Sequence, residues 1–288
     1  MTYEEFYNLN EQPFSNTPES KFYYDTNQHA EAMTRLFYAI DTMKGLAVLL
    51  GDIGTGKTTL ARKMLDKLQT GNYEVALLVI VHKAITAGWL LRRIAQQLGV
   101  HDPSDDKVQL LSQLYNQLLK IDEEGKKAVV LIDEANMLEN REIMEEFRGL
   151  LNLELPGKKL ITLILIGLPE LDDHLKLDEP LRQRVAVRFT LRSLSFSNVK
   201  EYVKHRLKVA GLKETKSIFT EEALLEIFKY SNGIPRLINT ICDNALFEGY
   251  LIKNQLIDKD LIKTVAMDLD LKEPVADSKD KKNECNIA

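Results

Sequence analysis

Hydrophobic residues along this chain follow two alternating patterns, short continuous runs and longer segments with helical spacing. Runs made mainly of apolar residues are typical of parallel strands buried on both faces, and they predict strands at 46–50, 73–82, 128–132, 159–166 and 185–190. Apolar positions three and four residues apart predict helices at 28–44, 58–68, 87–98, 105–124 and 141–153. Because strands that alternate with helices form a parallel sheet covered on both faces, the pattern predicts an α/β core.

From about Leu191 the pattern indicates helices only. Helices are expected at 195–210, 235–253 and 258–269, and a further helix follows Thr220, which has the side chain of a good N-cap residue. The second domain is therefore expected to be small and all-helical. The predicted organisation is an amino-terminal segment packing on the core (1–27), the core (28–190), the helical domain (191–270) and a disordered tail (271–288).

The loop after the first predicted strand has the spacing G-x-x-x-x-G-K-[ST], from Gly51 to Thr58. Its glycines let backbone N–H groups converge on an anion, Lys57 supplies a positive charge for the terminal phosphates, and Thr58 supplies a hydroxyl for Mg²⁺. The alternative is a glycine turn that ends in Lys-Thr by chance, but the preceding strand and following helix favour a site for ATP and Mg²⁺. The expected nucleotide contacts are Gly51, Asp52, Ile53, Gly54, Thr55, Gly56, Lys57, Thr58 and Thr59.

Two acidic residues, Asp133 and Glu134, end the third predicted strand. Asp133 is suited to hold the Mg²⁺ shell together with Thr58, and Glu134 to polarise a water molecule towards the γ-phosphate. The alternative is an acidic pair that merely ends a core strand in a solvated turn. The phosphate-binding loop upstream favours the catalytic interpretation, because both features fall at the carboxyl ends of parallel strands.

Two arginines follow the predicted core motifs. Arg184 precedes the last strand, where it could stabilise transition-state charge on a neighbouring subunit's γ-phosphate, or be a solvated residue with an ion-pair partner such as Glu179. Arg236 follows Pro235 at the start of a predicted helix. A cation there opposes the helix dipole, so a nearby anion is expected, either a nucleotide phosphate or a carboxylate of its own domain.

Composition narrows the class of protein. The chain has 288 residues, 44% of them hydrophobic, and a net charge of −5, so it can bury two cores. The start lacks the apolar stretch of a signal peptide, and no apolar run approaches the length of a membrane span. We expect a cytoplasmic protein that reaches the inner membrane, if at all, through a partner. The two cysteines and five histidines have no metal-ligand spacing and are interpreted as incidental.

Together these motifs resemble the AAA+ ATPases, and within them the GspA/ExeA-type general secretion pathway ATPases. The resemblance covers residues 3–268, and it rests on Phe6–Tyr7, Pro13–Phe14, Thr17–Pro18, Phe22–Tyr23, His29–Ala32, Gly167–Leu171, Leu181–Arg184 and Gly233–Asn239. It implies that Lys57 contacts nucleotide, Asp133 supports Mg²⁺ and Glu134 is the catalytic base.

The same resemblance implies that Arg184 acts in trans and Arg236 is a lid sensor. Two departures are visible. The family usually has glutamine where this chain has Leu168, whose side chain cannot hydrogen-bond to a phosphate. Secretion-type members also carry a transmembrane helix and a periplasmic domain, and we expect neither within these 288 residues.

Three functions remain open from the sequence. The first is an ATP-hydrolysing motor or switch, oligomeric in the ATP state, for a bacterial secretion, pilus or polysaccharide export system. The second is a DNA-handling adaptor of the transposition-helper type. The net negative charge and the acidic helix after Asp133 oppose it, and a basic group in the helical domain favours it: Arg192, Lys200, Lys204, Arg206 and Lys208. The third, motivated by Leu168, is a nucleotide-gated scaffold without hydrolysis.

Overall fold

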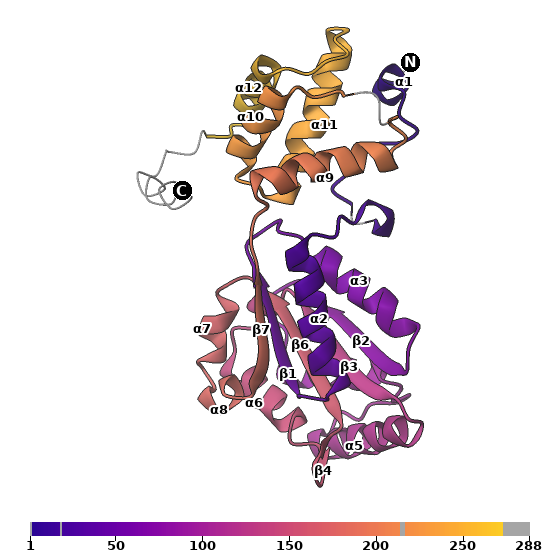
Figure 1. The fold of residues 1–288 in the computed structure, drawn as a ribbon. Coiled ribbons are helices and arrows are strands. Elements are labelled where there is room, and N and C mark those ends of the chain that lie inside the picture. Colours follow the sequence, from indigo (N-terminus) through magenta and orange to yellow (C-terminus); the bar gives the residue numbers. More distant parts are fainter. Residues whose placement is uncertain (1, 18, 214–216, 273–288) are drawn as a thin grey trace, which may run out of the picture. The chain divides into compact units, whose positions relative to one another are not determined.

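The chain folds as two compact units, residues 25–192 and residues 1–24 together with 193–288. Their folds are described here from a computed structural model, which describes residues 2–17, 19–213 and 217–272 (Figure 1). The tail predicted to be disordered lies, from residue 273 onward, outside the described residues. No helix within the described ranges is long and apolar enough to cross a membrane.

The first unit is built on a five-stranded parallel sheet with the strand order β2-β3-β6-β1-β7. All five strands predicted from the sequence are present: β1 (Leu46–Gly51), β2 (Tyr73–Val79), β3 (Lys127–Asp133), β6 (Ile161–Gly167) and β7 (Val185–Leu191). Every residue of β1 and β6 is buried, as expected for central strands covered on both faces. The predicted α/β class with a parallel sheet is confirmed.

Helices cover both faces of this sheet. The helices α2 (Asn27–Asp41) and α3 (Lys57–Gln69) lie in front of it in Figure 1. Leucines and isoleucines of α4 (Ala87–Gln97), α5 (Lys107–Glu123) and α6 (Arg141–Leu150) form one apolar cluster with Val48 and Leu50 of β1. Because alternate residues of a strand face opposite sides, these helices cover the other face.

The hydrophobic pattern did not predict the short elements that precede β6 and β7. A hairpin of β4 (Glu154–Leu155) and β5 (Lys158–Lys159) precedes β6, so the fourth main strand begins at Ile161 rather than at residue 159. Two short helices, α7 (Leu171–Leu175) and α8 (Glu179–Arg182), connect β6 to β7. Elements of two to five residues are too short for a periodicity to show.

The second unit is helical, as predicted. It consists of α1 (Tyr3–Tyr7), the 3₁₀ turn η1 (Ser20–Phe22), α9 (Phe196–Val209), α10 (Glu221–Ser231), α11 (Pro235–Leu251) and α12 (Lys259–Asp268). Thr220 caps α10 by accepting a hydrogen bond from the Ala223 N–H at 3.1 Å. Gly233 is needed before α11, since it has φ +70° and a Cβ there would lie 2.0 Å from the Leu194 carbonyl oxygen.

The amino-terminal segment belongs to the helical unit, not to the nucleotide core on which the sequence led us to expect it. Tyr7, Phe14 and Phe22 are buried in the apolar cluster of α9 to α12. The buried Arg206 of α9 holds the segment: its Nε donates to the Pro13 carbonyl at 2.5 Å and its Nη2 to the Ser15 carbonyl at 2.9 Å. Arg206 is therefore a structural residue rather than part of a surface patch.

Replacing Arg206 should destabilise the helical unit. In Arg206→Ala the Pro13 and Ser15 carbonyls lose their donor, and Phe22 loses the guanidinium 4.8 Å from its ring centre. We expect a loss on the order of 3 kcal/mol in the free energy of unfolding, measured by urea titration. Lys204→Ala, an exposed position on the same helix, is the matched control and should change this value by less than about 0.5 kcal/mol. Equal stability of the two variants would contradict the anchoring role.

Candidate functional site

The phosphate-binding loop joins the end of β1 at Gly51 to the start of α3 at Lys57. Gly56 is the N-cap residue of α3, and its φ of +101° is a conformation that glycine adopts readily. Since glycine has no side chain to cap the helix, the first N–H groups of α3 are left for another acceptor. A helix start of this kind is a binding site for an anion such as phosphate.

Lys57 lies across this loop. The residue is only 6% exposed, and Nζ donates to the carbonyl oxygens of Gly51 at 2.7 Å and Asp52 at 2.9 Å. The Thr55 hydroxyl also donates to the Asp52 carbonyl, at 2.8 Å. The loop is thus held by its own side chains, with the ammonium group inside its curve. Asp52 and Ile53, at the tip, are exposed.

Sheet order brings the acidic pair to the same edge as this loop. β6 lies between β3 and β1, with Leu165 level with Ile132 on one side and Gly167 level with Leu50 on the other. Asp133 and Glu134 follow Ile132, so they and the phosphate-binding loop flank the carboxyl end of β6. This is the edge where parallel α/β sheets bind ligands.

Asp133 has one oxygen engaged and one without a partner. Its Oδ1 accepts the Glu134 N–H at 3.0 Å, while Oδ2 is buried and has no hydrogen-bond partner among the described residues. A buried carboxylate oxygen without a hydrogen-bond partner costs free energy, so Oδ2 is suited to bind a cation or a water molecule. Carboxylate and hydroxyl oxygens are ligands of the kind Mg²⁺ takes, so Asp133 and Thr58 fit a magnesium site.

Glu134 has an uncommon backbone conformation, with φ 55° and ψ 35°. A glutamate in this left-handed region costs on the order of 1 kcal/mol, and such residues cluster at functional sites. Its side chain is partly exposed, unlike that of Asp133. The turn directs the chain away from the strand and leaves the carboxylate reachable by water.

Asn136, which the sequence did not single out, connects the two loops beside β6. It lies in the 3₁₀ turn η2 (Ala135–Met137) directly after the acidic pair. Its Oδ1 accepts the Leu168 N–H at 3.0 Å, and a Cβ on Gly167 would lie only 2.8 Å from that oxygen. The side chain of Leu168 cannot bond to phosphate, but the backbone at this position is fixed to the acidic turn.

His29 is a second residue whose role the sequence did not reveal. We interpreted it as incidental, although it falls in the segment that carries the family resemblance. In the structure it is buried on α2, and its Nε2 lies 3.4 Å from where a Cβ on Gly56 would be. It therefore packs against the phosphate-binding loop.

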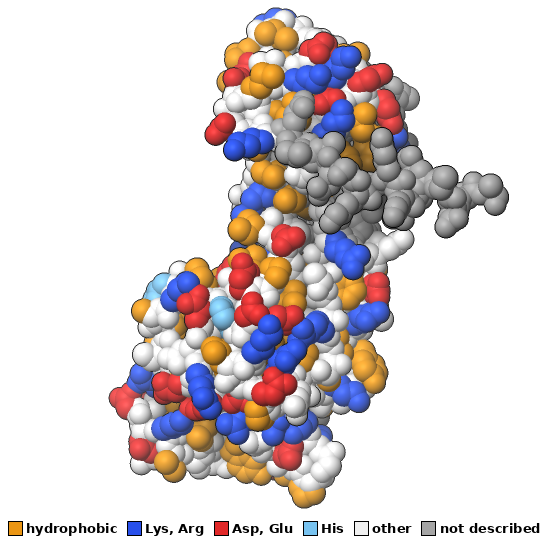
Figure 2. All heavy atoms as spheres, turned by 90° about the vertical axis from the view of Figure 1, so that its left-hand side faces the viewer, with side chains coloured by type: hydrophobic (Ala, Val, Ile, Leu, Met, Phe, Trp, Pro, Cys, Tyr) orange, Lys and Arg blue, Asp and Glu red, His pale blue; other side chains and the backbone are white. Residues whose placement is uncertain are grey.

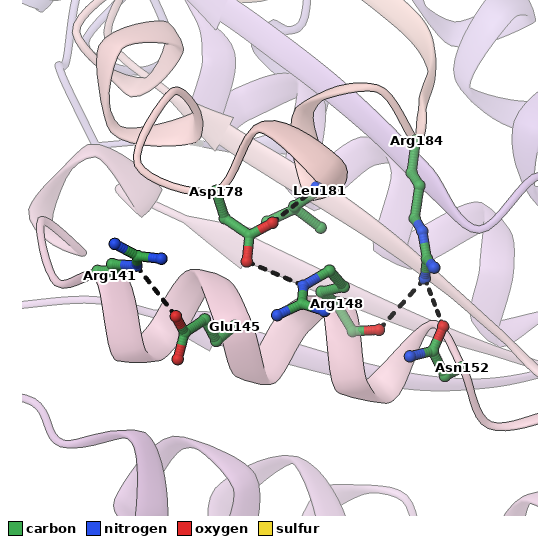
Figure 3. A network of polar contacts seen from close by, with 7 residues as sticks. All are labelled: Arg141, Glu145, Arg148, Asn152, Asp178, Leu181 and Arg184. Carbon is green, nitrogen blue, oxygen red and sulfur yellow. Dashed lines mark hydrogen bonds and ion pairs between the residues drawn. The ribbon is translucent and has the colours of Figure 1, made fainter.

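Arg184 lies at the opposite end of the sheet from the phosphate-binding loop of its own chain. It precedes β7, whose first residue, Val185, is level with Leu46 at the start of β1. Its Nη1 donates to the Asn152 side-chain oxygen at 2.7 Å and to the Arg148 carbonyl at 3.3 Å (Figure 3). Arg148 is itself held by Asp178, through Nε to Oδ2 at 2.9 Å.

The competing explanation for Arg184, an ion pair with Glu179, is not observed. Glu179 pairs with Arg182 instead, at 3.2 Å. Arg184 forms no ion pair with any described carboxylate, although its charge contributes to lowering the pKa of Glu154, after the larger effect of Lys159.

Arg236 begins α11 of the helical unit, directly after Pro235. Its side chain is exposed, and no described carboxylate pairs with it. The intradomain ion pair considered from the sequence is therefore not observed among the described residues. The helix start also lacks a side-chain cap.

Comparison with known proteins defines the class. Residues 40–175 match the AAA domain family, and these residues contain the phosphate-binding loop and the acidic pair. The α/β unit therefore has the P-loop fold of the AAA+ class. Its sequence resembles general secretion pathway protein A of Aeromonas hydrophila, with 39% identity over 251 residues that cover 86% of this chain and 45% of that protein. The chain thus spans about half the length of this relative.

Solved structures support the fold. The Cdc6p structure from Pyrobaculum aerophilum has a TM-score of 0.69 at 18% identity, covering 89% of this chain and 70% of that one. The Drosophila ORC structure bound to DNA has a TM-score of 0.67 at 19% identity, covering 94% of this chain and 66% of that one. At such identities the likeness concerns the fold. A P-loop fold of this class implies nucleotide binding.

Proposed function

We propose that this chain binds ATP with Mg²⁺ and hydrolyses it. The observation that carries the proposal is the placement of the phosphate-binding loop and the Asp133–Glu134 pair on the two sides of β6, at one edge of the sheet. Each motif alone is compatible with binding only. Together they supply phosphate contacts, a metal-supporting carboxylate and a base.

Each residue has a distinct task in this proposal. The N–H groups at the start of α3 and the Lys57 ammonium bind the phosphates, for which Lys57 exchanges at least one of its two loop carbonyls. Thr58 and Asp133 would hold Mg²⁺, which when bound neutralises charge on the phosphate oxygens. Glu134 accepts a hydrogen bond from a water molecule and orients it for attack on the γ-phosphorus.

We further propose that hydrolysis requires a second copy of the chain, which supplies Arg184. The support is its position at the far end of the sheet, away from its own phosphate-binding loop, together with its charge left unpaired by any described carboxylate. An arginine at the transferring phosphoryl group is worth about 10³ to 10⁵ in rate. Arg236 is proposed as the sensor from the helical unit.

Mixing two inactive variants tests the trans arrangement. Arg184→Ala keeps its own base but offers no arginine, and Glu134→Gln keeps the arginine but lacks the base. In a mixed oligomer, the Arg184→Ala site receives an arginine from its Glu134→Gln neighbour, so phosphate release should recover to a sizeable fraction of the parent rate. Arg182→Ala, whose residue already pairs with Glu179, is the control and should stay active alone. An Arg184→Ala variant as fast as the parent would defeat the proposal.

For the biological role we propose service to a bacterial envelope secretion, pilus or export system, with a protein partner of that system. The support is the similarity to general secretion pathway protein A, which extends over both units of this chain. Because the chain spans 45% of that relative, the role is carried over for this part alone.

The second candidate, a DNA-handling adaptor, is motivated by the DNA-bound ORC structure of similar fold. The basic group that favoured it is smaller than the sequence suggested, since Arg206 is buried, Lys200 pairs with Glu221, and Arg192 belongs to the other unit. The opposing acidic helix is weaker too: Glu139, Glu145 and Glu146 pair with Lys83, Arg141 and Lys107. Acidic and basic side chains are interspersed over the α/β unit in Figure 2.

A DNA-binding titration separates the two candidates. Because three of the five residues in this basic group are buried, paired or on the other unit, we expect no binding of a 30-base-pair duplex at about 50 mM salt with ATP and Mg²⁺ present, measured by fluorescence anisotropy. Binding that weakens steeply as salt is raised would favour the adaptor function instead.

A further inference from the structure

The chain passes from one unit to the other at two points, called the chain crossings below. Both crossings reach the nucleotide-binding unit at the start of α2. The units divide between Tyr24 and Asp25 and again between Arg192 and Ser193. α2 begins at Asn27, two residues after the first crossing. The second crossing, next to Arg192, is bonded to this same helix start through Gln28.

Gln28 makes a two-point contact with the backbone at the second crossing. Its Nε2 donates to the Arg192 carbonyl at 2.9 Å, and its Oε1 accepts the Arg192 N–H at 3.0 Å. β7 ends at Leu191, so the Gln28 amide holds the first residue beyond the strand. Both polar groups of the Arg192 backbone depend on this one side chain, which fixes the crossing to α2.

His29, the next residue, connects the helix start to the phosphate-binding loop. The Thr26 hydroxyl lies 2.6 Å from its Nδ1 and also caps α2 by accepting the His29 N–H at 3.3 Å. Burial lowers the pKa of His29, and this shift is opposed by the charge of Asp25 and by a hydrogen bond between the ring and the Thr55 backbone. Because only an acceptor favours the charged ring, the bond goes to the Thr55 carbonyl.

This arrangement fixes the tautomer and the orientation of the His29 ring. The Thr26 hydroxyl donates to Nδ1, and Nε2–H is directed at the loop, next to Gly56. A buried N–H and a loop carbonyl paired in this way hold the loop at one position relative to α2. Thr55 itself is 1% exposed, so no water replaces the bond at that carbonyl without movement of the loop.

We infer that His29 is a positioning residue for the phosphate-binding loop, and that Gln28 and His29 together couple the two chain crossings to nucleotide affinity. The inference rests on the proposed nucleotide site at this loop. Its physical basis is pre-organisation: a loop held in its binding conformation pays less entropy when phosphate binds. A shift of either crossing is transmitted to the loop through residues 26–29.

The test measures the affinity of the full chain for a fluorescently labelled ATP analogue in the presence of Mg²⁺, and the KM and kcat of phosphate release. His29→Phe keeps the ring volume and removes the N–H; we expect affinity to fall about 10-fold and KM to rise similarly, with kcat within about threefold. His29→Gln restores an N–H donor and should stay within about threefold of the parent. Gln28→Ala, which frees the second crossing, should weaken affinity about threefold.

Controls separate this inference from the proposed function. His101→Phe changes an exposed histidine of the same unit and should leave affinity and KM unchanged. If the parent binds nucleotide and Lys57→Ala does not, the proposed site holds, and an unchanged KM in His29→Phe would overturn the inference alone. The inference is also overturned if His29→Gln fails to restore affinity and is as unstable in urea as His29→Phe. His29 would then be a residue that only packs against the loop. A parent chain that binds no nucleotide would overturn the proposed function.

Discussion

Glu134→Gln should lower phosphate release by about 10² to 10⁴-fold while ATP still binds with an affinity within about threefold of the parent. Glutamine keeps the volume and the left-handed backbone of this position but cannot accept a proton from the attacking water. Asp133, Thr58 and Lys57 remain in place, so the phosphate and metal contacts are unaffected. The measurement is steady-state phosphate release beside a binding titration.

A matched acidic position separates this effect from a general loss of charge. Glu142 is an exposed acidic residue in the first turn of α6, and Glu142→Gln should hydrolyse at the parent rate. Hydrolysis by Glu134→Gln at that rate would mean that another group activates the water. A parent chain that binds ATP but releases no phosphate would support the scaffold function raised by Leu168.

Lys57→Ala should weaken ATP binding by about 100-fold. The ammonium group is the cation inside the loop, and charge-assisted hydrogen bonds to phosphate are each worth about 1.5 to 3 kcal/mol. The substitution also removes the donor shared by the Gly51 and Asp52 carbonyls, so the loop loses an internal tie. The measurement is a titration with a labelled ATP analogue in the presence of Mg²⁺.

Lys67→Ala provides the control on the same helix, because Lys67 is exposed in the last turn of α3, at the end of the helix away from the loop. Its affinity should equal that of the parent. Parent-like binding by Lys57→Ala would show that the nucleotide does not use this loop.

Local sequence patterns predicted the parts of this fold that depend on local chemistry. The runs that became β1, β3 and β6 are mostly apolar because their strands are buried on both faces. The loop at Gly51–Thr58 and the pair Asp133–Glu134 were found because each motif is continuous in sequence. Their placement beside β6 follows from strand order, which the sequence did not provide.

Contacts between residues far apart in the chain could not be predicted from the sequence. The apolar side chains of Tyr7 and Phe14 fit either of two cores, and the choice depends on Arg206, about 190 residues later, whose donors meet Pro13 and Ser15. The same arginine was misinterpreted as surface charge because a charged residue gives no sign of its burial. His29 was likewise set aside, since its partner, the Thr55 carbonyl, has no side-chain signature.

The central claim is that the loop at Gly51–Thr58 and the carboxylates of Asp133 and Glu134 form one site for Mg²⁺-dependent ATP hydrolysis. The most direct measurement is phosphate release from γ-labelled ATP by the purified chain, over a range of chain concentrations, with Mg²⁺ and with EDTA. We predict release that requires Mg²⁺ and is lost in Asp133→Asn, whose side chain keeps its shape but not its charge. Release that persists in EDTA, or in Asp133→Asn at the parent rate, would contradict the account.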